Sequence, residues 1–190
     1  MIFLVRHGET EWNRIGRYQG WSDSPLTERG LAQAAAIGQM LRATPEAAAA
    51  EIIASPLGRA RRTAEIIAGA LDGRPIRFDD RLREISLGSW DGLDRAEVRA
   101  RLAATPGGYR RHEWYFNSPH GESYSDFAGR VGAWLRDTGD APVIAVAHGI
   151  VTRVLRGLYA GLPRDVALQL NVAQDCAFLL HRGIITEIAA

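Results

Sequence analysis

The stretch IFLVRHGET (residues 2–10) gives the first indication of the fold. Its first four residues, Ile2 to Val5, are apolar and bulky, which predicts a short buried strand. Arg6 and His7 follow at the point where such a strand would end. Ligands of open α/β sheets bind beyond the carboxyl ends of the strands, so these two side chains are candidates for a binding site.

Strands and helices alternate along the rest of the chain. Further strands are expected at 51–54, 75–78 and 143–147, and a final hairpin at 176–180 and 184–188 with its turn at Arg182-Gly183. Helices are expected at 27–42, from about 59 to 71, at 94–103, at 122–137 and after His148. The alternation predicts an α/β fold, a three-layer α/β/α sandwich with a mostly parallel central sheet and an antiparallel edge strand from the hairpin.

Two of these helices begin with recognisable capping residues. Thr27 is a candidate N-cap for the first, and Asp94 with Glu97 forms a capping-box pattern for the third. In the first helix, the residues expected to face the core recur at helical spacing and are Leu31, Ala34, Ile37 and Leu41.

Residues 105–121 (TPGGYRRHEWYFNSPHG) break the alternation. They are rich in glycine, proline, aromatic and charged residues, which predicts a long surface segment or lid. A chain of 190 residues favours one domain. We therefore expect a single domain over residues 1–190 with a small lid insertion at about 105–121.

The composition excludes several classes of function. Apolar residues make up 46% of the chain and the formal net charge is +1, so no basic excess points to a nucleic-acid partner. All 23 residues counted as Lys+Arg are arginine, which excludes lysine Schiff-base chemistry and the phosphate-loop lysine. There is neither a signal-peptide pattern nor an apolar run of about 18 residues, so we expect a cytoplasmic protein with no membrane partner.

Polar residues follow four of the predicted strands. They are Arg6 and His7 after the first strand, Ser55 and Arg59 after the second, Arg83 and Glu84 after the third, and His148 and Gly149 after the fourth. Because the carboxyl ends of parallel strands meet at one edge of a sheet, we expect these side chains to converge.

The converging residue types suit phosphoryl transfer. A phosphomonoester is strongly anionic, so a neutral imidazole such as that of His7 is a better nucleophile than a carboxylate. The guanidinium groups of Arg6 and Arg59 match phosphate oxygens in geometry, and His148 adds a further donor.

The same chemistry needs a carboxyl group and close backbone approach. Glu84 is the candidate that protonates the leaving oxygen and later, as a carboxylate, activates water. Gly8 and Gly149 are expected to let the backbone approach the phosphate closely.

The sequence resembles the histidine phosphatase superfamily, which includes the cofactor-dependent phosphoglycerate mutases. The matching motifs are LVRHGETxxN (4–13), QG (19–20), DSPLT (23–27), SPLGRA with TA (55–60, 63–64), LRE with Gly88 and WDG (82–84, 90–92), GES (121–123) and VAHG (146–149). They extend over most of the chain.

The resemblance implies that His7 is phosphorylated and that Arg6, Arg59 and His148 form the phosphate pocket. It implies that Glu84 is the proton donor. No metal is expected, because the family needs none, and for the phosphatase that we favour we expect no cofactor.

The resemblance also implies that Asn13 and Gln19 contact phosphate or substrate. Simple turn residues remain the alternative for both. Arg59 has Arg61 and Arg62 as alternative candidates, and Glu84 has a surface ion pair with Arg81 or Arg83 as its alternative.

Other conspicuous residues are expected to lie outside the chemistry. Cys176 and Arg182 have the spacing of a cysteine phosphatase, but the residues between them are those of an apolar strand, so Cys176 is expected in the core. The histidines expected to be non-catalytic are His112, His120 and His181. The aromatic residues 114–116 either close over the substrate or anchor the lid.

Three functions are compatible with this sequence. We favour a phosphatase that acts on a small phosphorylated metabolite, because mutases of this type have a larger lid insertion and a C-terminal tail. A phosphoglycerate mutase is the alternative, and Arg110 and Arg111 would then bind a substrate carboxylate. A non-catalytic phosphate-binding domain is less favoured, since none of the core residues is missing. The physiological substrate and the oligomeric state, a homodimer included, are left open.

Overall fold

The computed structural model describes residues 1–104 and 112–190. Arg110, Arg111 and the first part of the expected lid lie outside the described residues. Within them the strands are β1 (Ile2–Arg6), β2 (Glu51–Ala54), β3 (Ile76–Phe78), β4 (Val143–Ala147), β5 (Cys176–His181) and β6 (Ile184–Ala189).

These strands form one sheet in the order β3-β2-β4-β1-β5-β6. Four neighbours, from β3 to β1, pair in parallel, and β5 runs antiparallel to both β1 and β6. The predicted mostly parallel sheet with an antiparallel edge is therefore confirmed, and the edge consists of the whole hairpin. Arg182 and Gly183 both have positive φ (49° and 77°), as a two-residue hairpin turn requires.

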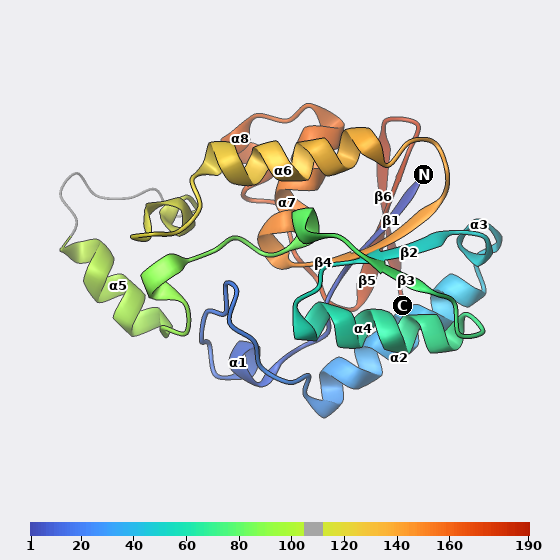
Figure 1. The fold of residues 1–190 in the computed structure, drawn as a ribbon, viewed down its shortest axis with the longest axis horizontal. Helices are drawn as coiled ribbons and strands as arrows, with labels where there is room; N and C mark the ends of the chain where they lie inside the picture. Colours follow the sequence, from blue (N-terminus) through green and yellow to red (C-terminus); the bar gives the residue numbers. More distant parts are fainter. Residues whose placement is uncertain (105–111) are drawn as a thin grey trace.

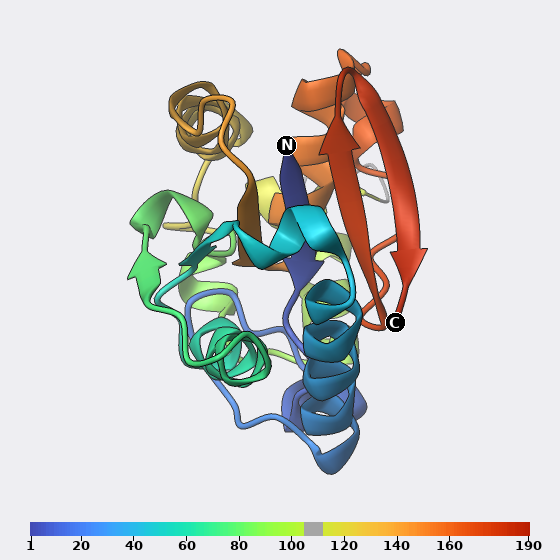
Figure 2. The ribbon, with the colours of Figure 1, turned by 90° about the vertical axis from the view of Figure 1, so that its right-hand side faces the viewer.

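Helices cover both faces of the sheet (Figures 1 and 2). The helices of the described residues are α1 (Glu11–Arg14), α2 (Glu28–Arg42), α3 (Pro45–Ala48), α4 (Gly58–Ala70), α5 (Arg95–Ala103), α6 (Tyr124–Asp137), α7 (Gly149–Ala160) and α8 (Arg164–Ala167). The longer ones match the predicted helices. The four-residue helices α1, α3 and α8 were not predicted, because one turn is too short to show a period.

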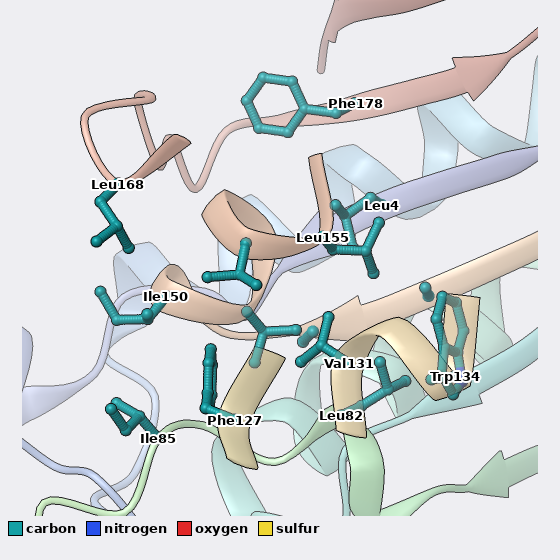
Figure 3. Packing of buried hydrophobic residues seen from close by; sticks show 14 of the residues in the cluster. Leu4, Leu82, Ile85, Phe127, Val131, Trp134, Ile150, Leu155, Leu168 and Phe178 are labelled. Atoms are coloured by element: carbon teal, nitrogen blue, oxygen red, sulfur yellow. The ribbon is translucent and has the colours of Figure 1, made fainter. Parts of the chain in front are cut away.

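The two layers of helices follow from the alternation of side chains along the strands. In β1, Phe3 and Val5 pack into an apolar cluster with residues of α2 and α4, whereas Ile2 and Leu4 join a second cluster with residues of α6 and α7. Figure 3 shows the second cluster, with Leu4 beside Leu155 of α7 and the side chains of α6 facing them. This is the predicted three-layer sandwich.

The predicted caps form as expected. The hydroxyl of Thr27 accepts a hydrogen bond from Gly30 N (3.0 Å), and Asp94 and Glu97 form a reciprocal capping box at α5. Each such cap contributes about 1 kcal/mol to the stability of its helix.

The prediction that Leu31 faces the core is wrong, because 38% of Leu31 is exposed. The buried stripe of α2 begins at Gly30 instead. The start of α2 lies so close to the residues after β1 that a Cβ atom on Gly30 would meet the carbonyl oxygen of Glu9 at 2.0 Å. Leu31, the next residue round the helix, points outward.

Cys176 is buried on β5 among apolar residues, as predicted. Burial raises the pKa of its thiol to about 11, so the side chain is not a thiolate at neutral pH. In residues 1–104 and 112–190 we find no helix with the length and apolar character needed to cross a membrane.

Candidate active site

The carboxyl ends of β1, β2 and β4 meet at one edge of the sheet. Arg6, the last residue of β1, pairs with Ala147, the last residue of β4, so His7 and His148 follow the two strands at the same level. A cavity of about 250 Å³ opens at this edge, and His7 and Glu84 are among the residues that line it. Of the side chains that the sequence predicted to converge, the structure brings together those of Arg6, His7, Arg59 and Glu84 at the cavity, with His148 and Ser55 hydrogen-bonded to each other. Arg83 does not line the cavity and pairs with Asp80 instead.

His7 is buried, and its hydrogen bonds show which ring nitrogen carries the proton and which holds a lone pair. Its Nδ1 lies 2.8 Å from the carbonyl oxygen of Gly8, which only accepts, so Nδ1 carries the proton. The other nitrogen, Nε2, therefore holds a lone pair and accepts a hydrogen bond from Arg59 Nε at 3.3 Å. The nucleophilic atom of the ring thus faces a guanidinium group.

The surroundings of His7 also keep the imidazole neutral. Burial lowers its pKa well below the usual 6.5, and the positive charges of Arg59 and Arg6 lower it further, against the hydrogen bond to Gly8. A neutral imidazole at neutral pH is the state required for attack on phosphorus.

Arg59 is held by the loop that precedes α2. Its NH1 donates to the carbonyl oxygen of Ser22 (2.8 Å) and to Asp23 Oδ1 (3.1 Å), and its NH2 donates to the carbonyl oxygen of Gly20 (2.8 Å). The side chain is almost fully buried, whereas those of the alternative candidates Arg61 and Arg62 are exposed. Of these three arginines, Arg59 is therefore the one whose side chain lines the cavity.

The guanidinium group of Arg6 uses its NH1 in a hydrogen bond, whereas its Nε has no partner in the described part of the chain. Its NH1 donates to the carbonyl oxygen of Val172 (2.5 Å). Its Nε is buried and has no hydrogen-bond partner among the described residues. Burial lowers the pKa of Arg6 to about 10, against the attraction of Glu84, so the side chain remains cationic at neutral pH.

His148 lies beneath the cavity, fully buried at the N-cap position of α7. Its Nε2 lies 2.7 Å from the Ser55 hydroxyl, and its ring is centred 5.2 Å from that of His7. Its Nδ1 is buried and, in the described part of the chain, makes no hydrogen bond. Together with Arg6 Nε it forms a pair of unsatisfied buried nitrogens, a feature expected where a ligand supplies the missing hydrogen-bond partners.

Glu84 is oriented by the N-terminus of α7. Its Oε2 accepts a hydrogen bond from Ile150 N and its Oε1 accepts one from Ile85 N, both at 3.1 Å. Arg81 and Arg83 form ion pairs with other carboxylates, Arg81 with Asp79 and Asp137 and Arg83 with Asp80. The surface ion pair proposed as the alternative for Glu84 is therefore wrong.

Gly149 and Gly8 serve different purposes. A Cβ atom on Gly149 would lie 3.6 Å from Arg6 Nε and 3.7 Å from Glu84 Oε2, inside the cavity wall. A Cβ atom on Gly8 would meet the carbonyl oxygen of Gly30 at 2.3 Å. The packing of α2 therefore already requires glycine at position 8, independently of any approach to phosphate.

Asn13 and Gln19 both line the cavity, but their side chains also make the contacts of turn residues. Gln19 Nε2 donates to the Thr10 hydroxyl (2.9 Å), and Gln19 Oε1 accepts from the Ser24 hydroxyl (3.1 Å). Asn13 Oδ1 accepts from Thr10 N (3.2 Å) in the capping box of α1. Their contact with substrate stays a prediction.

Several cavity residues were missed by the sequence analysis. They are Arg17, Arg95, Arg153 and Tyr18. In a chain whose basic residues are all arginine, nothing in the pattern separates the three arginines from surface arginines.

In the described part of the lid, the aromatic residues make the contacts of anchors, and closure over a substrate stays a prediction. Trp114 is buried and packs edge-on against Tyr18, with ring centroids 4.6 Å apart, so it anchors the segment. Phe116 packs against Tyr124 and Phe127 at the start of α6. Tyr115 lines the cavity and lies where it can contact a substrate.

The two buried histidines predict how stability depends on pH. Burial lowers the pKa of both His7 and His148 well below the value of about 6.5 expected in the unfolded chain. Below about pH 6.5 the unfolded chain therefore binds protons that the folded chain does not, and the free energy of unfolding falls by up to about 1.4 kcal/mol per pH unit for each histidine. Urea unfolding between about pH 7 and pH 5.5 measures this slope.

The variant His7→Gln serves as the control, because it should remove about half of that slope. A free energy of unfolding that stays constant or increases as the pH falls through this range would show that the two imidazoles are not held neutral.

No group of three or more histidine, cysteine, aspartate or glutamate side chains within residues 1–104 and 112–190 is arranged to hold a metal ion.

The chain is similar to proteins of one family. The model of the "Histidine phosphatase superfamily (branch 1)" matches residues 2–182. A Photorhabdus laumondii protein named "Probable phosphoglycerate mutase GpmB" is 40% identical over 188 residues, covering 93% of this chain and 81% of that protein.

Solved structures show the same fold. Bacillus stearothermophilus YhfR superposes with a TM-score of 0.81 at 33% identity, over 99% of this chain and 95% of that one. A mycobacterial glucosyl-3-phosphoglycerate phosphatase, solved in complex with VO3, has a TM-score of 0.76 at 31% identity, over 99% and 96% of the two chains.

Proposed function

The chain belongs to the histidine phosphatase superfamily (branch 1), and we propose that it is a phosphatase that hydrolyses a small phosphomonoester through a phosphohistidine at His7. The observation that carries the proposal is the state of the His7 ring. It is buried and neutral, and its Nε2 lone pair faces Arg59, with the unpaired nitrogens Arg6 Nε and His148 Nδ1 in the same site.

In the first step, His7 Nε2 attacks phosphorus and the bond from phosphorus to the leaving oxygen breaks. Arg6, Arg59 and His148 stabilise the charge on the oxygens of the transferring group, and removal of one such donor typically costs about 10²- to 10³-fold in rate. Glu84, in its protonated form, donates its proton to the leaving oxygen, so an alcohol departs.

In the second step, water attacks the phosphohistidine. Glu84, now a carboxylate, accepts a proton from that water as the new bond to phosphorus forms. The bond between phosphorus and His7 Nε2 breaks, and inorganic phosphate and neutral imidazole are regenerated. One water is consumed and no metal is required.

A phosphoglycerate mutase is the second candidate, and two observations favour it. Relatives at 40% identity carry that name. In addition, Arg17, Arg95 and Arg153 line the same cavity outside the phosphate pocket, where they suit a second anionic group of a substrate. The phosphatase is supported by the 31% identical neighbour whose name is that of a phosphatase.

The two candidates are separated by incubating the protein with 3-phosphoglycerate and 2,3-bisphosphoglycerate, and with a panel of phosphorylated metabolites, in the presence of a chelator. We expect release of inorganic phosphate from at least one panel member to exceed interconversion of 3- and 2-phosphoglycerate. Rapid interconversion with negligible phosphate release would establish the mutase instead, and dependence on magnesium would contradict both.

A further inference from the structure

Arg130 of α6 makes an unusual set of contacts behind the segment that carries Glu84. Its NH1 donates to the carbonyl oxygens of Arg81 (2.8 Å) and Arg83 (2.7 Å), and its NH2 donates to the carbonyl oxygen of Glu84 itself (2.9 Å). One guanidinium group therefore binds three backbone carbonyls within four residues.

A carboxylate completes this arrangement from the other side. Arg130 Nε and NH2 donate to the two oxygens of Glu122, at 2.7 and 2.8 Å. Glu122 Oε2 also accepts a hydrogen bond from Ser86 N (2.9 Å), and Glu122 N donates to the carbonyl oxygen of Ser86 (3.0 Å). The pair thus holds the chain on both sides of Glu84.

The segment needs such support because it has no regular structure of its own. Residues 84–87 lie in neither a helix nor a strand, so no backbone ladder fixes their carbonyls. Apart from Arg130, the donor to the carbonyl oxygen of Glu84 is Trp21 Nε1 (2.8 Å), whose side chain is 44% exposed. Irregular backbone with few partners is free to shift unless other groups restrain it.

Arg130 is itself rigidly placed. It lies over the ring of Phe127, with its guanidinium carbon 4.6 Å from the ring centroid. Phe127 and Val131, on the same helix, are fully buried in the apolar cluster of Figure 3. The core therefore fixes α6, α6 fixes Arg130, and Arg130 fixes the backbone of Glu84.

From these contacts we propose that Arg130, paired with Glu122, is a positioning residue that holds the Glu84 carboxyl group at the leaving oxygen of the substrate. This inference rests on the proposed function, in which Glu84 is the proton donor. Arg130 contacts the backbone of Glu84 and takes no part in bonding to the substrate.

The consequence is a loss of activity that depends on the leaving group. An alkoxide leaves poorly without a proton, whereas 4-nitrophenolate is stable and leaves without one. A misplaced Glu84 therefore slows the first step, transfer of the phosphoryl group to His7, when the substrate is an alkyl phosphate, and it has little effect on that step with 4-nitrophenyl phosphate. The second step, hydrolysis of the phosphohistidine, is common to both substrates and does not distinguish them. General damage to the fold would reduce both rates by the same factor.

The experiment compares the single-turnover rate of the first step in the wild-type protein, Arg130→Gln and Arg130→Lys, measured as release of 4-nitrophenol from 4-nitrophenyl phosphate and of glycerol from glycerol 3-phosphate. For Arg130→Gln we expect about a 10- to 100-fold loss on the alkyl phosphate and a loss below about 3-fold on the aryl phosphate. Lysine keeps the charge but lacks the planar fork that reaches both Glu122 oxygens, so Arg130→Lys should restore only part of the selective loss.

Arg77→Gln is the matched control. Arg77 also forms ion pairs, with Glu51 and Asp79, but it lies on β3 and makes no bond to the segment around Glu84. The ratio of the rates of Arg77→Gln on the alkyl and the aryl phosphate should equal that of the wild-type protein. If Arg130→Gln does not fold, Glu122→Gln provides the test, because it weakens the same pair and should give a smaller selective loss in the same direction.

In folded variants, an equal loss of the first-step rate with both substrates, or no loss with either, would overturn the positioning role. The proposed function would then remain intact. A wild-type protein that hydrolyses neither substrate, nor any member of the metabolite panel, would overturn the proposed function and this inference with it.

Discussion

Replacement of His7 by alanine is expected to lower the rate of phosphomonoester hydrolysis by about 10⁴-fold or more. The change removes the atom that forms the covalent intermediate, and the position of the ring shows why no neighbour replaces it. His148 lies beneath the cavity with Nε2 engaged by Ser55. The measurement is the rate of phosphate release from the best substrate of the panel, with unfolding followed in parallel.

His181→Ala is the control for this prediction. His181 is the last residue of β5 and is not among the described residues that line the cavity. It should retain the wild-type rate. A His7→Ala protein that is folded and keeps more than about one per cent of the activity would show that another group is the nucleophile.

Replacement of Glu84 by glutamine is expected to lower kcat on an alkyl phosphate by about 10²- to 10⁴-fold. The amide has nearly the same shape, and its oxygen accepts one of the two backbone hydrogen bonds that the carboxylate accepts from Ile85 and Ile150. It cannot, however, donate and recover a proton as a carboxylic acid does. Initial rates on glycerol 3-phosphate measure the effect.

The control for this prediction is the same Glu84→Gln variant with a second substrate, whose leaving group does not need a proton. The loss of rate in the first step should be much smaller with 4-nitrophenyl phosphate, and the burst of 4-nitrophenol should exceed the steady-state rate because hydrolysis of the phosphohistidine still lacks its base. Identical losses in the first step with both substrates would assign the proton transfer to a group other than Glu84.

Much of the fold was predictable because its signals are local. The alternation of strands and helices, the caps at Thr27 and Asp94 and the Arg182-Gly183 turn each depend on a few neighbouring residues. What failed depends on packing between distant segments. Leu31 has the spacing of a core residue, and only the close approach of α2 to the chain after β1 turns it outward.

The centre of the site was predictable for a related reason. Arg6, His7 and His148 follow parallel strands, so sheet geometry alone places them together. Residues that support this centre carry no such signal. Asp23 orients Arg59, and Arg130 holds Glu84, through contacts that bridge 36 and 46 positions along the chain. These distances become short only in the folded protein.

The most direct test of the account is the identification of the phosphorylated residue. We expect rapid acid-free quenching during turnover, followed by peptide mass spectrometry, to find one phosphoryl group on the peptide that contains His7, stable in base, labile in acid and lost on standing in buffer. A phosphoryl group on another residue, or hydrolysis at full rate with none trapped at any time, would contradict the account.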